Sequence, residues 1–137
     1  MEDKLEIIDQ LAEIQDVIFV GGTSEYLQGI KNELRDIDVV VTNLSILSHI
    51  GWIFKIEDYS IPGLNTNRGY IRRGGIVIDI FVADNLPEYV KIGKYKCQTV
   101  QSMITLKEDT LEKNQHLLTA GNLEKVKQSI KRLRDTL

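Results

Sequence analysis

The chain has 137 residues, of which 42 % are hydrophobic and 27 % are charged, and these values predict one globular domain rather than a disordered polypeptide. A net charge of −3 argues against a protein that holds nucleic acid mainly through bulk positive charge. The single cysteine, Cys97, excludes an intrachain disulfide and cannot alone supply a zinc site, so a reducing compartment is expected.

The amino-terminal sequence and the hydropathy of the chain bear on its location. Residues 1–6 are acidic, whereas a secretory signal or a transit peptide would be basic at this position. No apolar run approaches the roughly 20 residues that a membrane-spanning helix needs. We therefore expect a cytoplasmic protein that has no membrane partner.

The N-terminal part predicts a helix, a strand and a second helix. Apolar residues recur at helical spacing over residues 3–15, which indicates an amphipathic helix. Residues 17–20 form a β-branched and aromatic run that predicts a short strand. The glycine pair 21–22 ends this strand, and Thr23 is expected to cap a helix that runs to about Glu33.

The middle of the chain predicts further strands. Residues 36–41 predict a strand with a carboxylate at every other position at its start, and Asn43 is expected to cap a helix that runs through Ile50. Residues 52–56 predict a third strand. The polar segment 58–67, which contains proline and glycine, predicts a loop.

An antiparallel hairpin is expected next. Residues 69–73 and 76–82 flank Gly74 and Gly75, a dipeptide that supplies the positive φ of a two-residue hairpin turn. After the hairpin, residues 95–98 allow two interpretations, a short edge strand or no strand.

The C-terminal part predicts two helices. The first covers residues 101–118, and Gly121 and Asn122 are expected to separate it from the second. The second helix carries an apolar seam at spacings of three and four residues, formed by Leu123, Val126, Ile130, Leu133 and Leu137. We expect this seam to pack on the sheet, with a dimer seam as the alternative.

Together these elements predict an α/β (α+β) fold with a mixed sheet of about four to five strands. We expect a single domain over residues 1–137, with its core at about 17–82 and a helical part at about 100–137. Helices are expected on one face of the sheet, the face that carries Ile37, Val39, Ile78 and Ile80.

Three carboxylates on two of the predicted strands carry the chemistry. Side chains alternate between the faces of a strand, so Asp36 and Asp38 share one face, away from the apolar residues between them. The same alternation places Asp79 off the core face of its own strand. Clustered carboxylates repel one another and require a cation, and oxygen ligands select hard ions such as Mg²⁺. Two Mg²⁺ ions are expected at Asp36, Asp38 and Asp79, as in two-metal phosphoryl transfer.

The glycine pair predicts a phosphate site beside these carboxylates. Gly21 and Gly22 let the backbone approach a phosphate closely. Thr23 and Ser24 begin the following helix, whose N-terminal N–H groups favour anions. The sequence therefore predicts that a nucleoside triphosphate binds at Gly21, Gly22, Thr23 and Ser24.

The pattern resembles the nucleotidyltransferase superfamily related to DNA polymerase β. Its core motif is a hydrophobic residue with Gly-[Gly/Ser], a short helix, Asp-h-[Asp/Glu]-h and a third carboxylate on a later strand, and all parts occur here in order over about residues 17–82. The stretches 20–29 and 35–41 look most like the small prokaryotic branch, which includes nucleotidyltransferase toxins of abortive-infection systems. Many minimal members carry an arginine soon after the glycine pair, where this chain has Glu25 and Tyr26.

The resemblance implies a minimal nucleotidyltransferase fold and an activity. The expected reaction moves a nucleoside monophosphate from an NTP to an acceptor hydroxyl of RNA, a protein or a small molecule, and releases pyrophosphate. One Mg²⁺ is expected at Asp36, Asp38 and the triphosphate, and the other at Asp79 and the acceptor oxygen. In the relatives a helix after the carboxylate strand bears a lysine, for which Lys107 is the candidate here.

Each candidate residue also has a simpler structural interpretation. Asp36 alone is most often a strand-start residue, and Asp79 alone could form a salt bridge with Arg72 or Arg73. The joint occurrence of the glycine turn, the spacing and all three carboxylates favours an active site. Arg73 is more often a solvated strand residue than a triphosphate ligand, but its proximity to Asp79 keeps nucleotide binding as an alternative.

Two other functions remain open at the level of sequence. The first is a non-catalytic module that keeps this fold and binds a protein partner of the toxin–antitoxin type. The second is a nucleotide-binding protein whose metal site does not support turnover. Intact carboxylates favour the enzyme over both.

Overall fold

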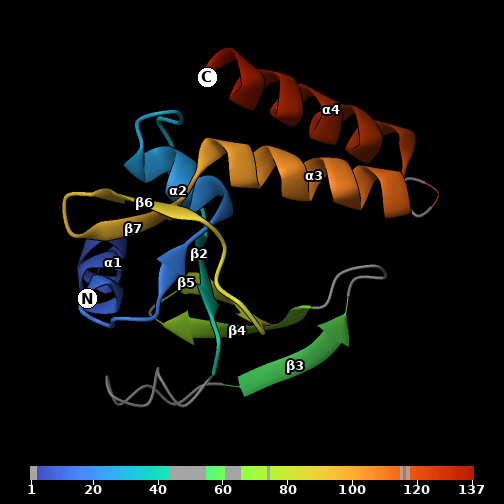
Figure 1. Ribbon diagram of the computed structural model, residues 1–137. Helices are drawn as coiled ribbons and strands as arrows, with labels where there is room; N and C mark the ends of the chain where they lie inside the picture. Colours follow the sequence, from blue (N-terminus) through green and yellow to red (C-terminus); the bar gives the residue numbers. More distant parts are fainter. Residues whose placement is uncertain (1–2, 44–54, 61–65, 74, 115, 117) are drawn as a thin grey trace.

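The computed structural model describes residues 3–43, 55–60, 66–73, 75–114, 116 and 118–137. In this part of the chain, four helices accompany one mixed sheet of seven strands (Figure 1). The helices are α1 (Lys4–Ala12), α2 (Gly21–Leu27), α3 (Val100–Asn114) and α4 (Ala120–Asp135). The strands are β1 (Ile18–Phe19), β2 (Ile37–Val41), β3 (Lys55–Ser60), β4 (Thr66–Arg73), β5 (Ile76–Ala83), β6 (Tyr89–Ile92) and β7 (Tyr95–Gln98).

The sheet has the order β3-β4-β5-β2-β1-β7-β6. Strand β2 pairs in parallel with β5, and β1 pairs in parallel with β7, whereas the other neighbours are antiparallel. The predicted mixed sheet with two C-terminal helices is confirmed. Five strands correspond to the five predicted ones, β7 was one of two alternatives, and β6 was not expected.

One face of the sheet carries the main hydrophobic core. Alternate residues of β2 and β5 are fully buried there, as predicted, namely Ile37, Val39, Val41, Ile78 and Ile80. Helix α1 covers this face with Ile7, Ile8 and Leu11, which are also fully buried. The helical layer expected on this face is therefore present.

The opposite face carries a smaller apolar cluster, and the C-terminal helices lie beyond it. Ile18, Val20 and Val40 form this cluster, against which Phe81 packs. Helix α3 lies over this side of the molecule, and α4 runs antiparallel along α3 (Figure 1). None of the described helices combines the length and apolar character that crossing a bilayer requires.

The seam of the last helix packs on α3 rather than on the sheet, which corrects the sequence-based expectation. Ile130 and Leu133 of α4 form a buried cluster with Met103 and Ile104 of α3. Leu137, which was assigned to the seam, is 73 % exposed because it lies beyond the end of α4. The C-terminal helices thus form a hairpin with its own apolar interior.

Several helices begin or end at other residues than predicted. Helix α1 begins after Asp3, whose carboxylate accepts from the Glu6 backbone N–H at 2.8 Å, and it ends at Ala12. Helix α4 begins at Ala120 because Thr119 caps it, so Gly121 and Asn122 lie in its first turn instead of between the helices. Helix α3 ends at Asn114 instead of residue 118.

Helix α2 differs most from its prediction. It begins at Gly21, whose φ is +53°, rather than at Thr23, and it ends at Leu27 rather than near Glu33. The chain therefore enters the helix directly at the glycine pair. Thr23, the predicted cap, lies inside the helix, where its hydroxyl contacts β2 instead.

The predicted hairpin is confirmed in β4 and β5, with Gly75 at φ +82° in the turn. The strands extend into the predicted loop 58–67, because β3 runs to Ser60 and β4 begins at Thr66. The helix expected after Asn43 and through Ile50, the first residues of the strand predicted at 52–56, and Gly74 lie outside the described residues.

Strands β6 and β7 complete the sheet beyond β1. Strand β7 lies inside the sheet and not at its edge, since Cys97 is the register partner of Phe19 in β1. The ring of Tyr95 meets that of Phe19 edge-on, with centroids 6.1 Å apart. Strand β6, whose four residues are all exposed, is therefore the edge strand at this end of the sheet, and β3 is the edge strand at the other end.

Candidate functional site

Asp38 and Asp79 lie side by side on the two central parallel strands. They are register partners in the β2–β5 ladder, and neighbouring strands lie about 4.7–4.9 Å apart. Asp38 is half-buried, and Asp79 is only 7 % exposed. Asp36, immediately before β2, is exposed. The structure thus brings two of the three predicted carboxylates together. The third, Asp36, lies two residues before Asp38, outside the strand.

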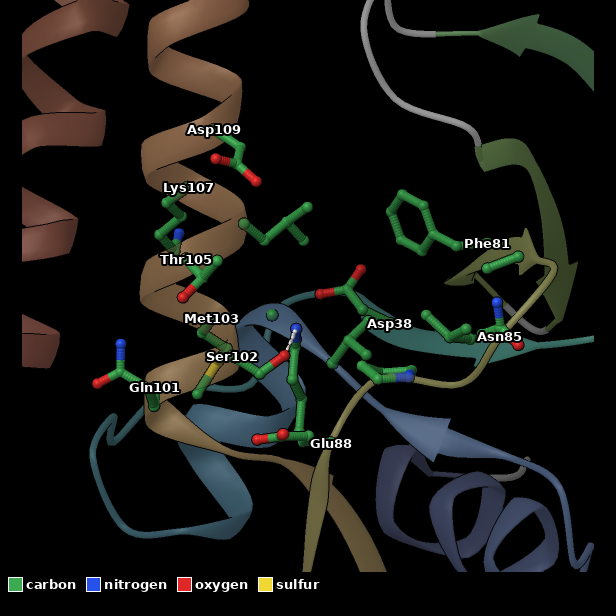
Figure 2. Close-up of a pocket in the computed structure, with 17 residues that line it drawn as sticks. Asp38, Phe81, Asn85, Glu88, Gln101, Ser102, Met103, Thr105, Lys107 and Asp109 are labelled. Carbon is green, nitrogen blue, oxygen red and sulfur yellow. Dashed lines mark hydrogen bonds between the residues drawn. The ribbon is translucent and has the colours of Figure 1, made fainter.

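A cavity of about 700 Å³ lies between this part of the sheet and α3; we call it the main cavity. The sheet lines it with Asp38, Val40 and Phe81, and α3 lines it with Met103 and Lys107 among others. Figure 2 shows Asp38 pointing from β2 into the space between α3 and Phe81. The lining combines apolar surface with a few charged and amide groups, as is common in small-molecule sites.

A second cavity of about 610 Å³, the side cavity, lies next to the first. Apart from Gly22, its lining residues are polar or charged, namely Lys31, Asn32, Glu33, Arg35, Asp36 and Asp38. Asp38 therefore borders both cavities, whereas Asp36 borders only the side cavity. Asp79 lines neither cavity, although its register partner lines both.

The glycine pair lies directly against Asp38. A β-carbon on Gly21 would lie 3.2 Å from Asp38 Oδ2, closer than ordinary contacts allow. A β-carbon on Gly22 would lie 3.7 Å from Lys31 Nζ and 4.0 Å from Asp38 Oδ2. Gly21 borders the main cavity and Gly22 the side cavity, so the pair forms backbone surface at the junction of the two.

Thr23 and Ser24 support this turn from the interior. Both are fully buried. The Thr23 hydroxyl donates to the Asp36 carbonyl at 3.2 Å and accepts from the Asp38 N–H at 2.8 Å. The Ser24 hydroxyl donates to the Gln98 carbonyl at 2.8 Å. These side chains fix α2 to β2 and β7, and the surface that faces the cavities belongs to the glycines.

Lys107 shares the main cavity with Asp38. It lies on α3 and is half-buried, and this burial lowers the pKa of its ammonium group, against the opposing effect of Glu25. Nearby Lys31 and Arg132 lower its pKa further, and Asp38 raises it. The lysine expected on a helix after the carboxylate strand is therefore in the same cavity as the carboxylate.

Arg73 occupies the end of β4, where it is the register partner of Ile76. The partner of Asp79 on this strand is Tyr70. The Arg73 side chain is outside the described part of the structure, so its expected contact with a triphosphate stays a prediction.

Glu25 is a charged residue of this region that the sequence analysis assigned no role. It is 1 % exposed, and its carboxylate contacts Arg132 of α4 at 2.9 Å and Lys31 at 3.4 Å. The first pair is 107 residues apart in sequence, so no local pattern indicates it. The only signal in the sequence was an acidic residue where many members of the resembled family carry a basic one.

The donor set is suited to Mg²⁺. Its ligands would be carboxylate oxygens, which this ion prefers, and it is often bound by one or two carboxylates together with substrate phosphates and water. Asp38 and Asp79 supply such a pair in register. No group of three His, Cys, Asp or Glu side chains arranged to hold a metal occurs among the described residues, so a bound ion would depend on the substrate for further ligands.

The sequence matches no protein-family model and no curated protein. Among solved structures, it is similar to the crystal structure of a candidate nucleotidyltransferase from Thermotoga maritima. The two share a TM-score of 0.54 and 17 % identity, and the match covers 96 % of this chain and 92 % of the other. At this identity, the likeness establishes the fold alone. This chain therefore has a nucleotidyltransferase-like fold.

Proposed function

We propose that this protein is an Mg²⁺-dependent nucleotidyltransferase, which transfers a nucleoside monophosphate from an NTP to an acceptor hydroxyl and releases pyrophosphate. The observation that carries the proposal is the pairing of Asp38 with Asp79 on adjacent parallel strands, with Asp38 and Lys107 both lining the main cavity. The nucleotidyltransferase-like fold supports it.

The residues around the two cavities have the following roles in the proposed reaction. Asp38 and Asp79 hold the metal, with Asp36 next along the same strand face, and Lys107 offers a positive charge to phosphate oxygens. When bound, Mg²⁺ polarises the phosphoryl group and neutralises developing charge. The backbone at Gly21 and Gly22 leaves room for the triphosphate beside Asp38.

The bond changes follow from this arrangement. The acceptor oxygen forms a bond to the α-phosphorus, and the bond from that phosphorus to the bridging oxygen of the β-phosphate breaks. Pyrophosphate leaves with the bonding electron pair. We assign Asp79 to accept the proton of the acceptor hydroxyl, since it is the register partner of Asp38, which lines both cavities.

Pyrophosphate release tests this proposal. Purified protein is incubated with each labelled NTP and Mg²⁺, together with an RNA, a protein or a small-molecule hydroxyl acceptor. Asp38→Asn and Asp79→Asn are expected to lower the rate at least about 100-fold because the metal loses a charged ligand. Asp16→Asn, which removes an exposed carboxylate that lines neither cavity, is the matched control and should keep the wild-type rate. Wild-type turnover in the Asp38 and Asp79 variants would refute the assignment.

A scaffold for a protein partner is the second candidate, and the edge strand favours it. Tyr89, Val90 and Ile92 of β6 are 43 %, 40 % and 36 % exposed. In the family that the sequence resembles, such a partner would be of the toxin–antitoxin type. The labelled-NTP experiment separates the functions. Transferred label indicates an enzyme, and NTP binding without product indicates a nucleotide-binding protein. A protein that binds no NTP would support the scaffold function.

A further inference from the structure

Glu25, Lys31 and Arg132 form a cluster of three charged side chains, the Glu25 cluster, that connects three parts of the chain. Glu25 belongs to α2, Lys31 to the segment that leads to β2, and Arg132 to the last turn of α4. The carboxylate is buried, whereas the two cations are about two-fifths exposed, at 37 % and 44 %. Each cation therefore has one side on Glu25 and another toward solvent.

Within the Glu25 cluster positive charge exceeds negative charge, whereas the lining of the side cavity carries Lys31 and Arg35 against Glu33, Asp36 and Asp38. Glu25 has one negative charge against the two cations of its cluster, and the half-buried Lys107 experiences all three of them. A buried ion pair is weak support for stability, since an apolar replacement of similar volume is often equally stable. The carboxylates of the side cavity repel phosphate, so Lys31 and Arg35 are the side chains of its lining that can attract a polyphosphate.

Lys31 is held at two points by the same residue. Its backbone N–H donates to the Glu25 carbonyl at 3.3 Å, and its Nζ lies 3.4 Å from Glu25 Oε2. Its ammonium group also lies next to Gly22, where a β-carbon would be only 3.7 Å away. Because its position is already fixed, Lys31 would lose little conformational entropy when a ligand binds.

The arrangement of the two cavities suits an NTP that reacts at its α-phosphorus. Asp38 and the glycine pair lie at their junction, so a nucleotide whose α-phosphate is at Asp38 can place its nucleoside in the larger, more apolar main cavity. The β- and γ-phosphates then fall in the polar side cavity, where Lys31 and Arg35 supply the cations.

We infer that Lys31 binds the β- and γ-phosphates, and afterwards the leaving pyrophosphate, in the side cavity, and that Glu25 is the positioning residue that holds it there. Arg132 secures Glu25 from α4. This inference rests on the proposed nucleotidyl transfer. It assigns the binding of the leaving pyrophosphate to Lys31 and Glu25, which lie outside the glycine and aspartate motif.

Titration calorimetry with Mg²⁺ and three probes tests the inference: pyrophosphate, a nucleoside monophosphate and a non-hydrolysable NTP analogue. Lys31→Met is expected to weaken pyrophosphate and analogue binding about tenfold, since one charge-assisted contact is lost, and to leave monophosphate binding unchanged. Lys31→Arg keeps the charge and should stay within about threefold of wild type. Lys94→Met is the matched control. Lys94 lies in the turn between β6 and β7 and also forms an ion pair with a carboxylate, that of Asp9 in α1 at 3.2 Å, but it lines neither cavity.

Glu25→Asp tests the positioning role. Glu25→Gln would also raise the net positive charge and could tighten anion binding. Glu25→Asp keeps the charge but shortens the side chain by one methylene, so that its carboxylate lies farther from Lys31. We expect weaker pyrophosphate binding with unchanged monophosphate binding. A purely structural role would lower the melting temperature and leave both affinities of the folded protein unchanged, which would overturn the role of Glu25. If this variant fails to fold, the Lys31 variants still decide the inference.

The outcomes separate the inference from the function. Wild-type pyrophosphate affinity in Lys31→Met, or an equal loss of monophosphate affinity, would overturn the inference even if the enzyme turns over NTPs. A wild-type protein that binds pyrophosphate through Lys31 but transfers no label would refute the proposed function alone. A wild type that binds neither pyrophosphate nor the analogue would overturn both.

Discussion

Gly21 is the residue at which backbone geometry and the site meet. Its φ of +53° is strained for any other residue, and a β-carbon there would lie 3.2 Å from Asp38 Oδ2. The glycine is therefore required twice, once by the turn from β1 into α2 and once by the carboxylate beside it.

Gly21→Ala is expected to lower stability by about 1–2 kcal/mol because of the left-handed backbone, and to lower activity about 10- to 100-fold because Asp38 must move. Urea unfolding and pyrophosphate release measure the two effects. Gly93→Ala is the matched control: Gly93 has φ +61°, but a β-carbon there meets nothing within 4 Å. It should lose similar stability and keep full activity. Equal activity losses in the two variants would show that the contact with Asp38 is irrelevant.

The partly buried charge of Lys107 lowers the stability of the folded protein. Burial lowers its pKa in the folded protein, so the folded state holds this proton less tightly than the unfolded chain. The resulting cost to stability is present at neutral pH and declines as the pH rises through the lowered pKa toward that of the unfolded chain. A residue kept at such a cost is a candidate for function.

Lys107→Met should therefore melt at or above the wild-type temperature at pH 7, with the difference shrinking in alkaline buffer, while its affinity for an NTP analogue falls. Melting curves over a pH series and calorimetry check these effects. The control is Lys113→Met, which changes an exposed lysine in the last turn of the same helix and should alter neither property. A destabilised variant with normal affinity would indicate a structural lysine.

Residue chemistry was partly accessible from the sequence. The pairing of Asp38 with Asp79 follows from strand alternation and from the order of glycine turn and carboxylates. The ion pair of Glu25 with Arg132 could not be predicted, because it depends on how α4 packs. A buried acidic residue has no sequence signature when its partner lies on a distant element.

At the scale of elements, the attachment of α2 to β2 positions the glycine turn. The helix has only seven residues, so it depends on tertiary contacts rather than on its own propensity. The Thr23 hydroxyl supplies one of them, since it bonds both the Asp36 carbonyl and the Asp38 N–H.

Thr23→Val keeps the shape of this side chain and removes its hydroxyl. We expect a loss of about 1–3 kcal/mol in the free energy of unfolding, since the Asp38 N–H loses its partner. Thr110→Val is the control, because the Thr110 hydroxyl donates to the Leu106 carbonyl in an exposed turn of α3, where the change should stay within about 0.5 kcal/mol. Denaturation in urea compares them, and equal effects would exclude a special role for Thr23.

Elements with strong local signals were predictable, and those defined by pairing were not. The β4–β5 hairpin carries alternating residues around a glycine turn, and both strands occur where expected. Strand β6 has no such signal and exists because it pairs with β7. The apolar seam of α4 was predicted, but the prediction that it packs on the sheet was wrong, because it packs on α3. Helical spacing indicates an apolar face and does not indicate which element covers it.

At the scale of the whole molecule, the central sheet separates two environments. Helix α1 covers one face, which carries the main core. Helix α3, with α4 along it, lies over the other face (Figure 1), and α3 residues line the main cavity. The carboxylates lie on the cavity side because the buried residues of β2 and β5 occupy the alternate positions. The fold thereby places the paired acidic groups on the same side of the sheet as the helix that carries the half-buried Lys107.

The structure of the protein with a non-hydrolysable NTP and Mn²⁺, located by anomalous scattering, tests the central claim most directly. Our account predicts an ion within about 2.0–2.3 Å of carboxylate oxygens of both Asp38 and Asp79, with the α-phosphate bound to the same ion. The nucleoside should lie in the main cavity, and the β- and γ-phosphates beside Gly22 and Lys31. A nucleotide bound elsewhere, or an ion that neither aspartate contacts, would contradict the account.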